Sequence, residues 1–318
     1  MNELKCKICF NEQKNRKFCV KEMMFGLRDA FLYFECSSCG CIQIAEFPLN
    51  MDRYYPPDYY SFNEHINVDN MIPDRFSIFL KKQLISYYSG KKNMLGVLLA
   101  LKYKNELPWL KQELVNFSYR VLDVGCGNGK TLNQLFTYGF KHLRGIDPFI
   151  KEKIDYPNGI KISKVDIENV ETENDIVMFH QSFEHMRDPV GVLKEAYRVL
   201  SPEGHLVIRV PIASSYAWRK YGTNWVQLDA PRHFFLHSIK SMKIVAAEAG
   251  FQSTRIIYDS TDFQFVGSEA YLRNVSLVEY YSKPDIFSSD QKRIFAREAE
   301  QLNKRNDGDS ACFYFRKR

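Results

Sequence analysis

The chain has 318 residues, enough for two domains of ordinary size. Hydrophobic residues make up 45% and charged residues 26%, the proportions of a globular protein rather than of a disordered or fibrous one. The longest apolar run, residues 94–101, is far shorter than the roughly 20 residues that a membrane span needs. The N-terminal residues include lysines and no apolar core of a secretory signal, so we expect a cytoplasmic protein without a membrane span.

The net charge of +6 first suggests a nucleic-acid partner. The charge is nearly balanced at the N-terminus, where residues 1–50 have seven Lys and Arg against six Asp and Glu. Residues 283–318 have nine against six. Charge spread in this way is typical of a solvated surface, so nucleic-acid binding is not favoured. Mild basicity also suits an anionic small-molecule substrate.

The cysteines predict a metal site near the N-terminus. Cys6 and Cys9 form one Cys-x-x-Cys pair, and Cys36 and Cys39 form a second pair. Each pair turns two thiolates toward one ion, and two pairs complete the tetrahedral four-sulfur site of a structural zinc. The alternative is a set of free buried cysteines, since a chain of this length without a signal favours reduced thiols over disulfides.

Two further cysteines, Cys19 and Cys41, are alternative ligands for the same ion. Short strands are expected at residues 18–20 and 31–34, between the two pairs. The sequence therefore predicts a zinc-ribbon-like module over residues 1–48.

An aromatic linker and a helical segment are expected over residues 49–114. The linker contains Tyr54, Tyr55, Tyr59 and Tyr60 among several prolines, and either packs between domains or faces the substrate. From residue 73 onward the apolar spacing of three and four predicts helices.

From residue 119 the pattern becomes short apolar runs separated by helical stretches. Such alternation is typical of βαβ units in a doubly wound parallel sheet. Strands are expected at residues 120–124, 142–146, 160–164, 176–179, 205–210, 252–259 and 311–315. Helices are expected at 130–138 and 190–200, and a mainly helical insertion at about 262–309.

A glycine-rich turn follows the first of these strands. Gly125 and Gly127 let backbone amides approach a ligand closely. The Gly-x-Gly-x-Gly spacing lacks the last glycine of the dinucleotide fingerprint, although an NAD-binding protein remains the alternative. Asp123, at the end of the strand, would repel a diphosphate and suits the amino group of a ligand.

Two later strand ends carry a carboxylate each. Asp147 can accept both hydroxyls of a ribose, and Asp166 can reach an adenine amino group. The three strand ends are therefore suited to bind an amino acid, a ribose and an adenine, in that order.

On these residues the chain resembles the class I S-adenosylmethionine-dependent methyltransferases, over about residues 115–260 and the terminal strand. The resemblance implies an α/β, doubly wound, seven-stranded Rossmann-like sheet over residues 115–318, closed by an antiparallel final strand, and S-adenosylmethionine as cofactor. The implied cofactor contacts are Asp123, Gly125, Cys126, Gly127, Gly129, Asp147, Pro148, Asp166, Ile167, His180 and Gln181.

A narrower resemblance is to bacterial sugar methyltransferases with an N-terminal zinc-binding region. It rests on the cysteine pairs, on the tyrosines of residues 54–60 and on residues 228–233. It implies active-site tyrosines at Tyr59 and Tyr60 and a catalytic pair at Glu184 and His185.

Methyl transfer needs a positioned acceptor and a group that removes its proton. His185 is the first candidate for this base because an imidazole titrates near neutral pH, and Glu184 orients it or shares the role. His233 is the second candidate. Packing beneath the cofactor is the structural alternative for His185. The basic residues Arg219, Lys220 and Arg232 either hold an anionic group of the substrate or are surface charges.

The sequence thus favours methyl transfer to a small molecule, with an anionic sugar nucleotide of glycan or natural-product biosynthesis as the first candidate. The alternatives are O- or N-methylation of another metabolite, RNA modification with the ribbon binding nucleic acid, and a non-catalytic scaffold. The near-neutral ribbon argues against nucleic acid, as does the lack of a base-methylating motif after the fourth strand. The sequence does not indicate the oligomeric state.

Overall fold

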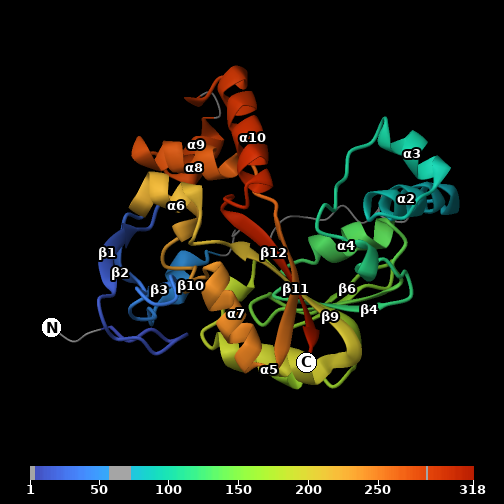
Figure 1. Ribbon diagram of the computed structural model, residues 1–318, viewed down its shortest axis with the longest axis horizontal. Helices are drawn as coiled ribbons and strands as arrows, with labels where there is room; N and C mark the ends of the chain where they lie inside the picture. The colour runs from blue at the N-terminus through green and yellow to red at the C-terminus, as the bar shows by residue number, and fades with distance from the viewer. Residues whose placement is uncertain (1–3, 57–72, 284–285) are drawn as a thin grey trace. The chain divides into compact units, whose positions relative to one another are not determined.

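A computed structural model describes residues 4–56, 73–283 and 286–318 (Figure 1). The chain forms two compact units. Unit 1 contains Met1–Pro56, Phe183–Gly191 and Arg209–Phe313, and unit 2 contains Pro57–Ser182, Val192–Ile208 and Tyr314–Arg318. The predicted active-site residues Tyr59 and Tyr60 lie outside the described residues.

Unit 1 contains a four-stranded sheet with the order β1-β2-β3-β10. The strands are β1 (Arg16–Lys21), β2 (Ala30–Glu35), β3 (Ile42–Ile44) and β10 (Phe235–Leu236). Neighbouring strands are antiparallel throughout. The two strands predicted between the cysteine pairs are confirmed as parts of β1 and β2. The last strand, β10, comes from much later in the chain, so the cysteine module shares its sheet with the segment that follows His233.

The described residues of unit 1 form five helices, and all of them except α8 (Phe263–Leu272) begin with a side-chain cap. The others are α6 (Tyr216–Tyr221), α7 (Ile239–Glu248), α9 (Leu277–Ser282) and α10 (Ser289–Lys304). Capping boxes at Ser238, Ser276 and Ser288 satisfy backbone N–H groups at the starts of α7, α9 and α10. Buried apolar residues of α8 and α9, such as Val266 and Tyr280, form a common core. Figure 1 shows α6, α8, α9 and α10 gathered together, with α7 apart from them.

An eight-stranded sheet has the order β11-β12-β9-β8-β4-β5-β7-β6. Its strands are β4 (Arg120–Val124), β5 (His142–Ile146), β6 (Ile154–Asp155), β7 (Lys161–Ser163), β8 (Asn174–His180), β9 (Leu200–Pro211), β11 (Phe251–Tyr258) and β12 (Ser310–Lys317). Each of the seven predicted strands is present. The additional strand is the two-residue β6, which pairs antiparallel with β7 at the sheet edge. The sheet is therefore mixed, as expected for an α/β fold.

The strand order reverses at β4. This strand is parallel to β5 on one side and to β8 on the other, with Val121 opposite Leu143 and Ile176. Ligands of open α/β sheets bind outside the carboxyl ends of the strands at such a reversal. The glycine-rich turn that follows β4 is therefore at the expected ligand position.

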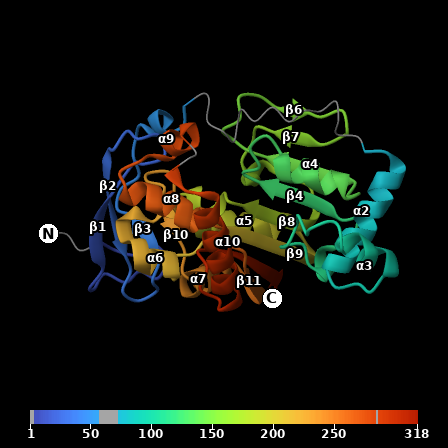
Figure 2. The same ribbon diagram turned by 90° about the horizontal axis from the view of Figure 1, so that it is seen from above.

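The helices of unit 2 include a helical hairpin that precedes the first strand of the sheet, β4, in the chain. The hairpin consists of α2 (Arg75–Tyr88) and α3 (Met94–Ala100), which pack against each other (Figure 2). Asp74 caps α2 and Asn93 caps α3. After β4 comes α4 (Lys130–Thr137), and α5 (Pro189–Val199) leads into β9. Within the described residues, no helix is long and apolar enough to cross a membrane.

Candidate active site and metal centre

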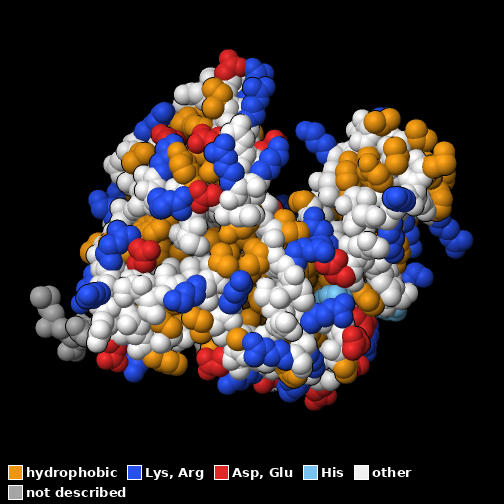
Figure 3. All heavy atoms as spheres, viewed as in Figure 1, with side chains coloured by type: hydrophobic (Ala, Val, Ile, Leu, Met, Phe, Trp, Pro, Cys, Tyr) orange, Lys and Arg blue, Asp and Glu red, His pale blue; other side chains and the backbone are white. Residues whose placement is uncertain are grey.

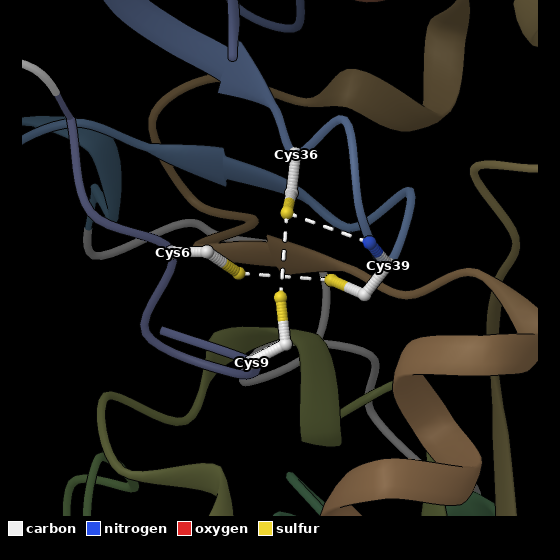
Figure 4. A group of neighbouring side chains, drawn as sticks. All are labelled: Cys6, Cys9, Cys36 and Cys39. Carbon is white, nitrogen blue, oxygen red and sulfur yellow. Dashed lines mark hydrogen bonds between the residues drawn. The ribbon is translucent and has the colours of Figure 1, made fainter. Parts of the chain in front are cut away.

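The four cysteines of the two Cys-x-x-Cys pairs converge in unit 1 (Figure 4). Their sulfur atoms all lie within 4.8 Å of one another. The Sγ atoms of Cys6 and Cys39 are 3.6 Å apart, and those of Cys9 and Cys36 are 3.4 Å apart. Four sulfurs at about 2.3 Å from a tetrahedral zinc would be about 3.8 Å apart, so the set fits such an ion closely.

Both cysteine pairs are built as the same turn. The N–H of Phe10 donates to the carbonyl of Cys6, and the N–H of Gly40 donates to the carbonyl of Cys36. Phe10 and Gly40 both have positive φ, at 60° and 71°. The amide group of Gln43 also donates to the Sγ of Cys6 at 3.0 Å, as expected around a thiolate that binds a metal.

The two alternative ligands are not part of this group. Cys19 lies exposed on β1, and Cys41 is buried with its thiol near the carbonyl of Ile42. None of the eight cysteines forms a disulfide.

In unit 2, the glycine-rich turn after β4 folds back on the end of β5. The N–H of Gly125 donates to the carbonyl of Ile146, and the N–H of Gly127 donates to the carboxylate of Asp147 at 2.9 Å. Gly125, Gly127 and Gly129 all have positive φ, which explains the alternating glycines. At Gly129 a side chain would also meet Ile162, because an added Cβ would lie 2.5 Å from the Cδ1 of Ile162.

Asp123 is buried, and one of its carboxylate oxygens is unpaired in the part of the chain that the structure describes. Its side chain is 2% exposed, and its Oδ1 has no hydrogen-bond partner among the described residues. Burial raises the pKa of Asp123 well above its usual value, and Asp147 raises it further. A positively charged amino group would relieve both effects, so the residue fits the amino-acid end of S-adenosylmethionine better than a phosphate.

Asp147 organises the turn as well as offering a carboxylate. Its two oxygens accept the N–H groups of Gly127 and Phe149, each at 2.9 Å. Burial raises the pKa of Asp147, although these backbone donors oppose the shift. Pro148 follows Asp147 in a half-buried position. Asp166 is exposed just before the short 3-10 helix Ile167–Asn169, and Ile167 is buried.

Cys126 acts as a spacer in the turn. Its Sγ occupies the place that a side chain at Gly145 would need, 2.4 Å from an added Cβ. Burial raises the pKa of the Cys126 thiol well above its usual value, so the thiol is not activated as a nucleophile.

The end of β8 is tied to the end of β4. The hydroxyl of Ser182 donates to the carbonyl of Val124 at 2.6 Å. The ring of His180 meets Trp109 edge-on, with centroids 4.4 Å apart. Gln181 has a positive φ of 53°, a strained conformation of the kind often found at ligand sites. Sequence reasoning did not single out Ser182 or Trp109, because their contacts join segments that are far apart in the chain.

A second cluster, in unit 1, follows β8 along the chain. Glu184 and His185 lie on the 3-10 helix Phe183–His185, and His233 lies just before β10. One potential ligand atom from each of the three residues lies within 4.8 Å of the others. The rings of His185 and His233 are in edge contact at 4.8 Å between centroids. The N–H of Phe234 donates to the carbonyl of Glu184, which fixes the two segments side by side.

Backbone carbonyls set the tautomers of both histidines. The Nδ1 of His185 is 2.8 Å from the carbonyl oxygen of Arg232, and the Nδ1 of His233 is 2.7 Å from that of Gln227. A carbonyl can only accept, so each Nδ1 carries a proton and donates it. Each Nε2 then has a lone pair that can take a proton from an acceptor.

The expectation that His185 titrates near neutral pH is wrong. Burial lowers the pKa of His185 to about 3, with a smaller contribution from His233. Burial also lowers the pKa of His233. Glu184 shifts the opposite way, because complete burial raises its pKa to about 8. At neutral pH the histidines are therefore neutral, and Glu184 is the group of this cluster that titrates near pH 8.

Arg232 neither faces an anionic group of a substrate nor is a surface charge, so both expectations for this residue are wrong. It is 0% exposed and its guanidinium contacts Asp229 at 2.6 Å and Glu22 at 2.8 Å. Burial alone would raise the pKa of Asp229, but Arg232 holds it below its usual value. The hydroxyl of Tyr33 donates to the carbonyl of His233, so β2 also supports this segment.

The other two basic candidates also have acidic partners. Arg219 binds Asp307 at 2.6 Å, and Lys220 lies 3.9 Å from Glu269. Tyr55, from the aromatic linker, places its hydroxyl 3.3 Å from the Nδ1 of His185.

The sheet order, the glycine-rich turn and the acidic strand ends define an α/β enzyme that binds a nucleoside-containing cofactor. A family model described as "Methyltransferase domain" matches residues 81–256, which is more than half of the chain. The chain belongs to this family and is an S-adenosylmethionine-dependent methyltransferase.

Curated relatives and solved structures are similar at low identity. A tRNA U34 carboxymethyltransferase of Methylococcus capsulatus is 25% identical over 221 residues, covering 64% of this chain and 68% of the relative. One from Sulfurimonas denitrificans is 26% identical over 189 residues, covering 52% and 60%. An S-adenosylmethionine-dependent methyltransferase from Mesorhizobium loti has a TM-score of 0.43 at 16% identity, covering 67% of this chain and 97% of that structure.

Proposed function

We propose that the protein transfers a methyl group from S-adenosylmethionine to a small polar acceptor, a sugar or a nucleotide-linked sugar of glycan or natural-product biosynthesis. The observation that carries the proposal is the cluster of Glu184, His185 and His233, in which Glu184 and His233 are buried and His185 is half-buried. Its two imidazoles are held in one tautomer, each with the Nε2 lone pair left to accept a proton. This arrangement suits removal of a proton from a hydroxyl or an acidic carbon of the acceptor.

The roles of the residues follow from their surroundings. The bound cofactor supplies an activated methyl group. Asp123 would hold the amino group of the cofactor, and Asp147 would hold its ribose. His185 takes the proton of the acceptor at Nε2 while its Nδ1 keeps the hydrogen bond to Arg232. Glu184, once ionised, stabilises the imidazolium that forms. His233 is the alternative base.

RNA is the second candidate acceptor, and the names of the curated relatives favour it. The two acceptors are separated by one assay. The protein is incubated with S-adenosylmethionine carrying a labelled methyl group, together with either a panel of nucleotide sugars or total tRNA. We expect label in a nucleotide sugar and none in tRNA. Label in tRNA alone would establish the second candidate and overturn the first.

We also propose that residues 1–48 form a structural zinc module beside a catalytic domain of residues 115–318. The purified protein is expected to contain about one zinc per chain, because four thiolates satisfy a tetrahedral ion. Cys36→Ser should lose the metal, and the matched control Cys19→Ser should keep it. If metal analysis finds no zinc in the folded protein, residues 1–48 do not form a zinc module. If the wild type contains a second metal ion and His185→Ala loses it, the cluster of Glu184, His185 and His233 is a metal site and not a proton acceptor.

Asp147→Ala is expected to weaken S-adenosylmethionine binding by roughly 1.5–3 kcal/mol, the range for a hydrogen bond to a charged group. The change also frees the N–H groups of Gly127 and Phe149, which should loosen the turn. Titration calorimetry measures the effect, with the exposed Asp155→Ala on β6 as control. Unchanged affinity in Asp147→Ala would mean that the ribose is held elsewhere.

A further inference from the structure

Although charge is nearly balanced in residues 1–50, the net positive charge of the protein lies in residues 75–105 of unit 2, which comprise the α2–α3 hairpin and the five residues after it. Residues 75–105 contain seven Lys and Arg and no Asp or Glu, whereas the rest of the chain has 37 Lys and Arg against 38 Asp and Glu. The seven residues are Arg75, Lys81, Lys82, Lys91, Lys92, Lys102 and Lys104. This segment therefore accounts for the whole net charge of +6.

The helix α3 turns its large apolar side chains outward. Met94, Val97, Leu98 and Leu101 follow the spacing i, i+3, i+4 and i+7 of a single helix face. They are 86%, 45%, 62% and 84% exposed. We call these four residues the α3 stripe. In an ordinary core helix such a stripe would face the protein, so its outward direction requires an explanation.

The opposite side of α3 is fitted to α2. Gly96 is buried there, and a Cβ at this position would lie 2.5 Å from the Cβ of Tyr87. Because only a glycine permits this approach, the helix cannot simply rotate to bury its stripe. Figure 3 shows hydrophobic side chains gathered over α3 with Lys and Arg beside them.

Lysines lie at both ends of the stripe. Lys92 precedes α3, and Lys102 and Lys104 follow it, all three exposed. The lysines of α2 are engaged instead with the body of unit 2, since Lys81 binds the hydroxyl of Thr137 at 3.0 Å and Lys82 lies over the ring of Phe117. Phe76 and Phe79 of α2 add exposed aromatic surface, at 67% and 48%.

We propose that the α2–α3 hairpin binds the surface of an anionic lipid bilayer. The α3 stripe enters the boundary between headgroups and acyl chains, and the flanking lysines contact the anionic headgroups. An aliphatic helix face with cations at its ends, and with no carboxylate between Asp74 and Glu106, matches such an interface on both counts. The inference does not rest on the identity of the methyl acceptor.

Two other partners fit the surface less well. A second copy of the chain would bring seven positive charges against seven more without a carboxylate between them, which is repulsive. Nucleic acid would suit the lysines, but the four side chains of the α3 stripe are aliphatic and offer no flat ring on which a base can stack. The exposed rings of Phe76 and Phe79 lie on α2 and not in the stripe.

The test is vesicle flotation of the full chain. We expect binding to phosphatidylcholine vesicles that contain about 30% phosphatidylglycerol, weakening as salt is added, and little binding to pure phosphatidylcholine. Lys92→Gln/Lys104→Gln should lower the partition coefficient about thirtyfold, since each lysine near the surface is worth about fivefold. Met94→Ser/Leu98→Ser should lower it at least about tenfold.

The matched controls are Ile294→Ser, at an exposed apolar residue of α10, and Lys194→Gln/Lys243→Gln, at exposed lysines of α5 and α7. Both should bind as the wild type does. Failure of the wild type to bind anionic vesicles, or equal binding by all variants, would overturn the proposal. The proposal would also be overturned if the wild type bound no vesicles but formed a dimer or bound total tRNA, and if the stripe and lysine variants abolished that binding.

Discussion

His185→Ala is expected to lower kcat by roughly 10²–10⁴-fold, the usual contribution of a positioned proton transfer. The affinity for S-adenosylmethionine should change little, because Asp123 and Asp147 carry the proposed contacts to the cofactor. Steady-state kinetics and titration calorimetry separate the two effects. His142→Ala, at an exposed histidine of β5, is the matched control and should leave both quantities unchanged.

Two outcomes would contradict this assignment. If His233→Ala is inactive while His185→Ala keeps near-wild-type turnover, the base is His233. If both variants remain active, the acceptor needs no protein base and positioning alone drives the reaction.

The pH dependence of the reaction should report Glu184 rather than His185. The pKa of His185 is lowered to about 3, so the imidazole stays neutral at and above neutral pH. The pKa of Glu184 is raised to about 8, so its carboxylate forms only as the pH rises through that value. Because the carboxylate stabilises the imidazolium, kcat/KM should rise through about pH 8 and level off above it. Glu184→Gln should remove this rise, and an unchanged profile in that variant would exclude Glu184 from the proton transfer.

Arg232→Met is expected to lower the free energy of unfolding by about 3–5 kcal/mol. Methionine has a similar volume but leaves the carboxylates of Asp229 and Glu22 buried without their cation. Urea unfolding measures the loss. Arg219→Met is the matched control, because its exposed ion pair with Asp307 should contribute at most about 1 kcal/mol. Equal effects of the two substitutions would show that the buried network does not stabilise the fold.

Local patterns were sufficient to predict the sheet and the cysteine group. The strands 120–124 and 142–146 were predicted to the residue, because each is a short apolar run that a turn ends at once. The convergence of Cys6, Cys9, Cys36 and Cys39 follows from their spacing, which two identical turns enforce.

Features that depend on distant partners were not predicted. From the sequence, Arg232 was a candidate for binding an anionic group of the substrate, because nothing in the sequence connects it with Glu22, 210 positions away. The pKa of His185 was misjudged for the same reason, since burial arises only when the chain has folded. The apolar spacing of residues 94–101 indicated a helix but could not reveal that its apolar face points outward.

A crystal structure of the protein with the demethylated cofactor and the acceptor found in the labelling assay would test the central claim most directly. The oxygen, nitrogen or carbon that receives the methyl group is expected to lie within about 2.6–3.2 Å of the Nε2 of His185, or one water molecule away. An acceptor whose reacting atom is remote from both His185 and His233 would contradict that claim.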